Sequence, residues 1–342
     1  MPSPEDVHHV VRSFFGVLAA HTLGAAVRLG IIDTIGDGEM TSDEVASACD
    51  THPEATKRLL RAMAGLVLLE ETEAGAFRVA PAGTLLYSGR PGSMASVVRL
   101  FTDPLTVRSW EDLTASVRTG EAAFPKHFGK SYFEYLEGDP QRAKEFNASM
   151  SEASHAAAEM LPHHFDFSAF GTVVDVGGGD GTLLASILRQ NPELKGVLFD
   201  TSNGLAQAEE ALGRSNVADR CTVTDGDFFS EVPRGGRLYI LKAVLHDWDD
   251  ERCLTILRNV REAVPDDGRL LVIEGVLPPR VDPQLRGAYL SDLNMLVNHG
   301  GKERTAEDFR VLFEKAGFDA PSISPLPLPG EIALIESAPT RS

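Results

Sequence analysis

Short apolar runs alternate with amphipathic helical segments between residues 171 and 274, and this alternation constrains the fold more than any other feature. Five of the runs read as strands, at Thr172–Val176, Lys195–Phe199, Cys221–Thr224, Leu238–Val244 and Arg269–Glu274. Because consecutive parallel strands need a crossover connection, which is usually a helix, the alternation predicts an α/β domain with a parallel sheet. The chain has 342 residues, which is enough for about two domains.

The first hundred residues have a different pattern, which is helical with short loops. Thr41 and Glu44 have the spacing of a capping box that opens a short helix, and a second helix is predicted from about residue 53 to residue 65. The runs 66–73 and 76–80 have the character of a hairpin. Two helices followed by a small hairpin are typical of a winged helix.

The charge of the chain argues against a nucleic-acid partner. Asp and Glu number 50 against 32 Lys and Arg, which gives a formal net charge of −18. Within the winged-helix segment, residues 41–90, acidic residues outnumber basic ones by seven to five. A surface that binds phosphates normally has a clear basic excess, so we expect a structural or dimerising role for this segment.

The sequence also predicts neither a membrane span nor a secreted protein. His21 and Arg28 interrupt the longest apolar stretch, and the first residues are acidic where a signal peptide is basic. Three widely separated cysteines form neither a disulfide framework nor a metal motif: Cys49, Cys221 and Cys253. We therefore expect a cytoplasmic protein with no metal ion and no membrane partner.

A glycine-rich turn, Val174-Asp-Val-Gly177-Gly-Gly179-Asp-Gly181, follows the first strand of the predicted sheet. Open α/β sheets bind ligands at the carboxyl ends of their strands, where glycines let the backbone approach the ligand. A dinucleotide fingerprint would need Gly or Ala where Thr182 stands. The carboxylates of Asp175 and Asp180 would repel a pyrophosphate but suit an ammonium group. The turn therefore favours S-adenosylmethionine over NAD, although taken alone it could be only a tight connection.

Acidic residues also end the next two strands. Asp200 follows the second strand at the spacing of a carboxylate that binds ribose hydroxyls. Asp227 follows the third strand, where it could bind an adenine amino group beside the ring of Phe228. Either aspartate alone could simply cap a helix or a turn. Together with the glycine turn they predict an adenosyl site along one edge of the sheet.

A histidine and two glutamates complete the candidate residues at this edge. His246 lies just past the fourth strand, and Glu274 ends the fifth. Glu303 precedes a helix that Thr305 is predicted to cap. Most single histidines are surface or core residues, but the place of His246 beside an adenosyl site makes it a candidate general base. Glu303 could equally be a solvated charge in a loop.

These motifs resemble those of the class I, S-adenosylmethionine-dependent aromatic O-methyltransferases, the caffeate O-methyltransferase-like type that also occurs in bacterial antibiotic biosynthesis. The resemblance covers about residues 10–336 and is most specific in the glycine-rich turn, in Leu245-His-Asp-Trp248 and in Gly300-Gly-Lys-Glu-Arg-Thr305. It implies a Rossmann-like, seven-stranded, mostly parallel sheet with a terminal antiparallel strand near residues 331–336. It also implies a helical, winged-helix-like dimerisation domain before the sheet.

The resemblance further implies an organisation in three parts and a homodimer. Residues 1–98 would form the dimerisation domain, residues 99–165 the linking helices that cover the active site, and residues 166–342 the methyltransferase domain. The N-terminal domain would mediate the dimer and contribute to the acceptor pocket of the second copy. The partners would then be a second copy and a small aromatic acceptor.

The resemblance also assigns roles to individual residues. Cofactor contacts would come from Ser154, Gly177, Asp200, Asp227, Phe228 and Lys242. His246 would be the general base, with Glu274 and Glu303 beside its imidazole. The acceptor would contact Phe146, Met150, Asn294, Met295 and Asn298. The acceptor of the plant enzymes does not transfer, because Ala153 stands where plant members can carry a polar residue.

The reaction expected is methylation of a phenolic hydroxyl on an aromatic or polyketide-type small molecule. Two alternatives stay open: methylation of nitrogen or carbon, and a relative that binds S-adenosylmethionine but hydroxylates or decarboxylates a similar substrate. Some relatives of the second kind lack the histidine, so His246 favours methylation. A regulator that uses its winged helix is disfavoured by the acidic charge.

Overall fold

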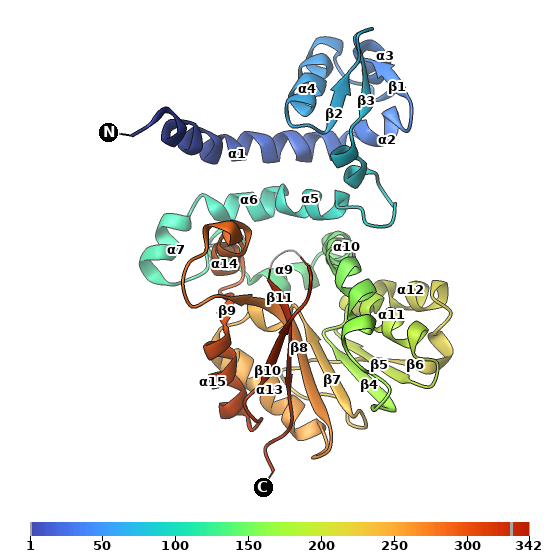
Figure 1. Cartoon of the computed structure of the whole chain (residues 1–342), viewed down its shortest axis with the longest axis vertical. Helices are drawn as coiled ribbons and strands as arrows, with labels where there is room; N and C mark the ends of the chain where they lie inside the picture. The colour runs from blue at the N-terminus through green and yellow to red at the C-terminus, as the bar shows by residue number, and fades with distance from the viewer. Residues whose placement is uncertain (1, 329–330, 342) are drawn as a thin grey trace. The chain divides into compact units, whose positions relative to one another are not determined.

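The computed structural model describes residues 2–328 and 331–341, and the chain divides into two compact units, residues 1–107 and 108–342 (Figure 1). The first unit contains five helices, a 3₁₀ helix and three strands within its described residues: α1 (Pro4–Arg28), α2 (Ile31–Ile35), β1 (Glu39–Thr41), α3 (Ser42–Ala48), α4 (Pro53–Gly65), β2 (Leu69–Glu71), β3 (Ala76–Val79), η1 (Pro81–Leu86) and α5 (Ala95–Phe101). Its strands form an antiparallel sheet in the order β1-β3-β2. The predicted helices and hairpin are confirmed, and the short strand β1 was not foreseen.

Local signals explain where the helices of the first unit begin. The predicted capping box is present, because the side chain of Thr41 accepts from the backbone of Glu44 and the Glu44 carboxylate accepts from the backbone of Thr41 at 2.7 Å. The core of this unit packs fully buried side chains from α2, α4 and β3, such as Ile31, Leu60 and Phe77. This core holds the small sheet against the helices.

The N-terminal helix α1 differs from the others, because most of its length carries exposed apolar side chains. Those more than half exposed are Val7, Val10, Phe14, Val17 and Leu18. By length and hydropathy alone, α1 could cross a membrane, although no such span was predicted from the sequence; only 17% of its apolar window is buried within the chain. Another protein surface would bury the same side chains equally well.

The second unit begins with a helical segment and continues into a large sheet. The helices before the sheet are α6 (Pro104–Trp110), which spans the boundary between the two units, α7 (Leu113–Thr119), α8 (Phe124–Phe128), α9 (Tyr132–Glu137) and α10 (Pro140–His164). The strands are β4 (Thr172–Val176), β5 (Lys195–Asp200), β6 (Cys221–Asp225), β7 (Leu238–Lys242), β8 (Arg269–Leu277), β9 (Arg304–Thr305), β10 (Ser322–Pro325) and β11 (Ile332–Ser337). The other helices are α11 (Thr182–Gln190), α12 (Ala208–Arg214), α13 (Asp250–Ala263), α14 (Arg286–Asn298) and α15 (Ala306–Ala316).

The order of the strands is that of a doubly wound sheet. Seven strands follow the path β10-β11-β8-β7-β4-β5-β6, and the two-residue β9 pairs with β8 as an eighth. The five strands predicted from the sequence run parallel to one another, while β11 pairs antiparallel with β8 and β10 pairs antiparallel with β11. Helices α10, α11 and α12 lie on one face, and α13 and α15 on the other (Figure 1). The Rossmann-like fold is thereby confirmed.

Candidate active site

His246 is positioned by a sharp turn after β7. The strand was expected to continue to Val244, but it ends at Lys242 because Ala243 has a φ of +51°, in the left-handed region. That conformation is unfavourable for a residue with a Cβ, and such strain clusters at functional sites. The turn leads into the single 3₁₀ turn η4 (Leu245–Asp247), which carries His246 at the carboxyl end of the sheet.

Glu274 supports this turn from β8. Its Oε1 accepts hydrogen bonds from three successive backbone amides, those of Val244 at 3.0 Å, Leu245 at 2.6 Å and His246 at 3.3 Å. The carboxylate is 96% buried, and burial raises its pKa. The hydrogen bonds of Glu274 therefore go to the backbone that carries the histidine rather than to the imidazole beside which it was expected, so Glu274 is a positioning residue in this structure.

Glu303 is the glutamate that contacts the ring. Its Oε1 lies 3.2 Å from His246 Nδ1 and accepts from Ser291 Oγ at 2.8 Å, while its backbone N–H donates to Asp292 Oδ1 at 2.8 Å. Burial opposes ionisation, but the hydrogen bonds from His246 and Ser291 outweigh it and lower the pKa of Glu303. A carboxylate held in this way fixes the orientation of the imidazole and leaves Nε2 for other partners.

Two further polar residues near His246 were missed by the sequence reasoning. Asp247 Oδ1 lies 3.8 Å from His246 Nε2 and 3.7 Å from Nδ1 of His299. Both residues lie inside or directly beside the strings that were recognised, Leu245–Trp248 and residues 300–305. Both residues could therefore have been noticed in the sequence, but the contacts that bring them close to His246 form only in the folded structure.

The surrounding carboxylates set the proton affinity of His246. Burial by itself lowers the pKa of the imidazole, but Asp247, Glu303 and Glu274 together raise it well above its usual value of 6.5. Asp247 is the largest of the raising contributions. The site thus favours a positive charge on the ring of His246.

The segment before α15 packs directly against the His246 turn. A Cβ on Gly301 would lie 2.1 Å from the backbone oxygen of His246, so only glycine allows this approach. Arg304 is completely buried and donates to the backbone oxygens of Leu245 at 2.7 Å and Trp248 at 2.8 Å, as well as to Asp250 at 2.9 Å. The backbone on both sides of His246 is therefore fixed by one guanidinium.

Lys242 at the end of β7 and Ser154 on α10, each of which the resemblance assigns to the cofactor, contact each other in the structure. Lys242 Nζ donates to Ser154 Oγ at 2.8 Å, and that hydroxyl donates to the backbone oxygen of Met150 on α10. Burial lowers the pKa of Lys242, against the charges of Asp175 and Glu274. This contact connects the covering helix α10 to the edge of the sheet.

The glycine-rich turn connects β4 to α11, as the sequence predicted. Gly177, Gly179 and Gly181 all have positive φ, and a Cβ on Gly177 would lie 2.8 Å from Val244 and 3.6 Å from the ring of Phe228. The turn, the His246 segment and the aromatic ring therefore meet at one point. Asp200 binds this turn, accepting from the Gly179 amide at 2.8 Å.

A buried carboxylate without a partner tests whether S-adenosylmethionine fits here. Asp175 is 99% buried, and its Oδ2 has no hydrogen-bond partner among the residues that the structure describes. Burial, followed by the charge of Asp200, raises its pKa to about 7. An ammonium group would supply the missing partner, and the glycines leave room for a ligand against the backbone. The residues present fit the cofactor.

The other predicted cofactor residue, Asp227, is exposed and caps its own turn. Its Oδ1 accepts from the amide of Phe229 at 2.8 Å, and its Oδ2 from Ser230 Oγ at 3.2 Å. These two hydrogen bonds explain the position of the Asp227 side chain without a ligand. The adenine contact stays a prediction.

The predicted acceptor residues separate into two groups. Phe146 on α10 contacts Tyr132, with ring centroids 5.7 Å apart, and Met150 is half-buried one helical turn further on. The three residues on α14 are buried: Asn294, Met295 and Asn298. Asn294 accepts from Trp110 at 3.0 Å and from Asn298 at 2.9 Å, so these amides bond within the core.

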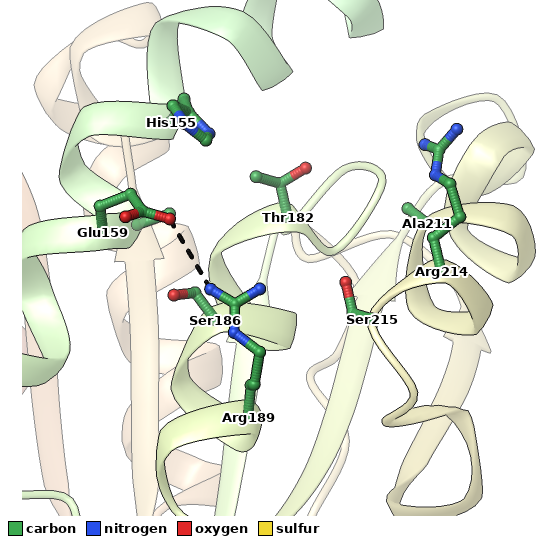
Figure 2. A pocket seen from close by; sticks show the side chains of 9 residues that line it. His155, Glu159, Thr182, Ser186, Arg189, Ala211, Arg214 and Ser215 are labelled. Carbon is green, nitrogen blue, oxygen red and sulfur yellow. Dashed lines mark ion pairs between the residues drawn. The ribbon is translucent and has the colours of Figure 1, made fainter. Parts of the chain in front are cut away.

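Among the described residues of the second unit, two of the hollows are of similar size. One, of about 190 Å³, lies between α10, α11 and α12, where Arg189 pairs with Glu159 at 3.7 Å (Figure 2). The other, of about 220 Å³, is lined by Lys242, His246, Glu274, Ser291 and Glu303 together with apolar residues. The second is therefore lined by the three residues that the sequence predicted as catalytic, His246, Glu274 and Glu303. No cluster of metal-ligating side chains occurs within the described residues.

The sheet topology, the glycine-rich turn and the orphaned carboxylate of Asp175 define a methyltransferase of the class that uses S-adenosylmethionine. Matches to sequence models of known families identify the protein more specifically than the fold and the site do. An O-methyltransferase domain matches residues 110–319, and an O-methyltransferase dimerisation domain matches residues 11–89. The chain belongs to this O-methyltransferase family.

Individual relatives cover nearly the whole chain. O-Demethylpuromycin-O-methyltransferase of Streptomyces alboniger is 44% identical over 95% of this chain and 87% of its own length. The solved structure of the mitomycin 7-O-methyltransferase MmcR has a TM-score of 0.90 at 33% identity, and the match covers 97% of each chain. The neocarzinostatin O-methyltransferase NcsB1, solved with S-adenosylmethionine and 2-hydroxy-5-methyl naphthoic acid, has a TM-score of 0.79 at 30% identity over 94% of this chain and 96% of its own. The chain is accordingly a methyltransferase dependent on S-adenosylmethionine.

Proposed function

We propose that this enzyme methylates a phenolic hydroxyl on an aromatic or polyketide-type small molecule, with His246 as general base. The observation that carries the proposal is the contact of 3.2 Å between His246 Nδ1 and the Glu303 carboxylate, which leaves Nε2 free to accept a proton. The relatives named for puromycin and mitomycin, and the naphthoic acid bound to NcsB1, support an acceptor of this class. Incubating the enzyme with S-adenosylmethionine and a panel of phenols, with mass spectrometry to detect one added methyl group, tests it.

The mechanism follows from the environment of the imidazole. S-Adenosylmethionine, when bound, supplies an electrophilic methyl group on a sulfonium. A phenol has a pKa near 10 and an ordinary imidazole has a pKa near 6.5. Transfer of the proton from the phenol to the imidazole is therefore unfavourable by about 3.5 pKa units. The carboxylates around His246 raise its pKa and reduce that difference. Glu303 then stabilises the imidazolium that forms, and Glu274 and Arg304 keep its backbone in place.

We further propose that helices α9 and α10 cover the site, as the segment 99–165 was expected to do. Tyr132 on α9 packs against His299 with ring centroids 4.7 Å apart, and Ser154 on α10 accepts from Lys242. Both contacts link the covering helices to residues at the edge of the sheet.

Asp200→Ala should weaken binding of S-adenosylmethionine by roughly 10- to 100-fold, because a charge-assisted hydrogen bond contributes about 1.5–3 kcal/mol. We place Asp200 on the ribose hydroxyls, and its carboxylate also fixes the glycine turn through the Gly179 amide. Calorimetric titration with S-adenosylhomocysteine measures the effect. Asp219→Ala, on the η3 turn (Ala218–Arg220), is the control and should bind normally. Unchanged affinity in Asp200→Ala would contradict the assignment.

The turnover rate should rise with pH above neutrality, because a base with a raised pKa loses its proton only in alkaline solution. Asp247 contributes most to the raised pKa of His246. Asp247→Asn should therefore lower that pKa and move the rising limb of the kcat profile to lower pH. Profiles of kcat between about pH 6 and 10 for both proteins measure the shift; a limb that stays in place would contradict this role of Asp247.

We also propose that a second copy of the chain covers the exposed apolar side chains of α1, and that the homodimer is cytoplasmic. The match of residues 11–89 to a dimerisation domain supports this over a membrane. Replacing Phe14 and Leu18 with Asp should shift the protein from dimer to monomer in analytical ultracentrifugation. The control is Val281→Asp, which is also highly exposed but lies outside α1. A stable dimer in the double variant would contradict the proposal.

A further inference from the structure

The hollow of about 190 Å³ between α10, α11 and α12 is separate from the hollow that His246 lines. None of the residues predicted to bind the cofactor or the acceptor, or to act in catalysis, is among its described lining residues. Its volume is many times what one water molecule needs, so a small organic ligand fits. Such a ligand would bind without using the catalytic residues.

The floor of this hollow is one face of α11. Thr182, Ser186 and Arg189 follow one another at spacings of four and three residues, which places them on the same side of a helix. The leucines and the isoleucine of α11 pack instead in the core beside the sheet. Figure 2 shows this floor between two walls, which are His155, Ala158 and Glu159 from α10, and Ala211, Arg214 and Ser215 at the end of α12.

Two hydrogen-bond donors of the floor lack an acceptor. Ser186 is 96% buried, and its Oγ has no partner among the described residues. The guanidinium of Arg189 lies 3.7 Å from Glu159, which exceeds the hydrogen-bond distance of at most about 3.2 Å. A buried hydroxyl without a partner is unfavourable. A ligand that brings acceptor oxygens would satisfy both groups.

The charge of the lining favours an anion. Two arginines, Arg189 and Arg214, face a single carboxylate, Glu159, although the whole chain has a formal charge of −18. Arg214 pairs with Glu210 at 2.8 Å, but about 70% of each side chain is exposed, and such pairs contribute little. Both guanidinium groups can therefore exchange their present partners for a ligand.

We propose that this hollow binds a small phosphate monoester through its phosphate group. A phosphate monoester carries about two negative charges at neutral pH and three strong acceptor oxygens. A guanidinium binds two such oxygens at once, which assigns them to Arg189 and Arg214. The hydroxyls of Ser186 and Ser215 donate to the remaining oxygen. The methyl groups of Ala158 and Ala211 leave room for the organic part of the ester.

The test titrates the full-length protein, saturated with S-adenosylhomocysteine, by ligand-observed NMR. Saturation keeps the probes out of the cofactor site. Phenyl phosphate should bind with a Kd of about 0.1–1 mM, and benzoate, with one charge and two oxygens, at least about tenfold more weakly. Benzoate binding as tightly as phenyl phosphate would overturn the choice of a phosphate group. Inorganic phosphate binding as tightly as the ester would overturn the choice of an ester and assign the site to free phosphate.

Variants of the lining should change the affinity in opposite directions. Arg189→Gln should weaken phenyl phosphate by roughly 10- to 100-fold, the effect of losing charge-assisted hydrogen bonds. Ser186→Ala, which removes only the hydroxyl, should weaken it as well. Glu159→Gln should strengthen binding by up to about fivefold, because its carboxylate repels the phosphate and competes for Arg189. A gain in affinity cannot result from a loss of folding.

Arg258→Gln is the matched control, because Arg258 is an exposed arginine on α13, on the other face of the sheet. It loses the same charge and should leave the Kd unchanged. Absence of phenyl phosphate binding to the wild type up to about 10 mM would overturn the site. Equal losses in Arg189→Gln and Arg258→Gln would also overturn it, since they would indicate a general attraction to positive charge. Methyl transfer is not measured, so either result leaves the proposed function intact.

Discussion

His246→Ala is expected to lower kcat by about 10²- to 10⁴-fold, the contribution typical of a positioned general base. The Kd for S-adenosylhomocysteine should change little, because the imidazole contacts Glu303 rather than the predicted cofactor residues. The remaining rate should increase with pH, since an ionised phenol needs no base. Rapid-quench measurements of methyl transfer at several pH values, together with calorimetry, measure both effects.

Two comparisons sharpen this experiment. An acceptor whose hydroxyl is already ionised near neutrality should lose much less rate in His246→Ala than an ordinary phenol. Glu303→Gln keeps a hydrogen-bond acceptor beside Nδ1 but removes the charge that stabilises the imidazolium, so its loss should be intermediate. Methylation of an ordinary phenol by His246→Ala at the wild-type rate would show that alignment of the reactants alone carries the reaction.

Arg304→Ala is expected to lower the free energy of unfolding by about 3 kcal/mol, because buried backbone oxygens lose their donor and a large buried side chain is removed. Arg304 is fully buried and bonds the oxygens of Leu245 and Trp248. Urea denaturation followed by fluorescence measures the change. Activity should fall as well, since the backbone around His246 loses its support.

Arg310→Ala is the matched control for this variant. Arg310 lies on the adjacent helix α15 and pairs with Glu307 and Glu314, but 41% of its side chain is exposed. Exposed ion pairs contribute about 0–1 kcal/mol, so the loss should be small. Equal destabilisation by both substitutions would contradict the special role of the buried arginine.

The sequence predicted the elements whose signals are local and periodic. The parallel strands, the glycine turn and the capping boxes at Thr41 and Thr305 all follow from spacing along the chain, and the structure confirms them. Strand β9 was missed because two residues are too few to show a pattern. The end of β7 was placed wrongly because nothing in the sequence distinguishes the left-handed conformation of Ala243.

The sequence predicted which residues belong to the candidate site, but not all of the contacts that they make. Glu274 was expected beside the imidazole, yet its position opposite three amides depends on the pairing of β8 with β7. The approach of His299 to Asp247 depends on the loop that Gly301 brings against the His246 turn. Such contacts between distant segments have no signature in spacing or composition.

The neighbouring residues Glu303 and Arg304 have separate roles. This separation determines which of them a relative with a different reaction would need to retain. Glu303 contacts the ring of His246, whereas Arg304 contacts the backbone on either side of it and the carboxylate of Asp250. A descendant that no longer removes a proton would be free to replace His246 and Glu303 but would still need Arg304 to fold. In relatives that catalyse a different reaction, we therefore expect the arginine to be retained more often than the histidine. A relative with this arginine but without the preceding glutamate would have kept the fold after losing the original reaction.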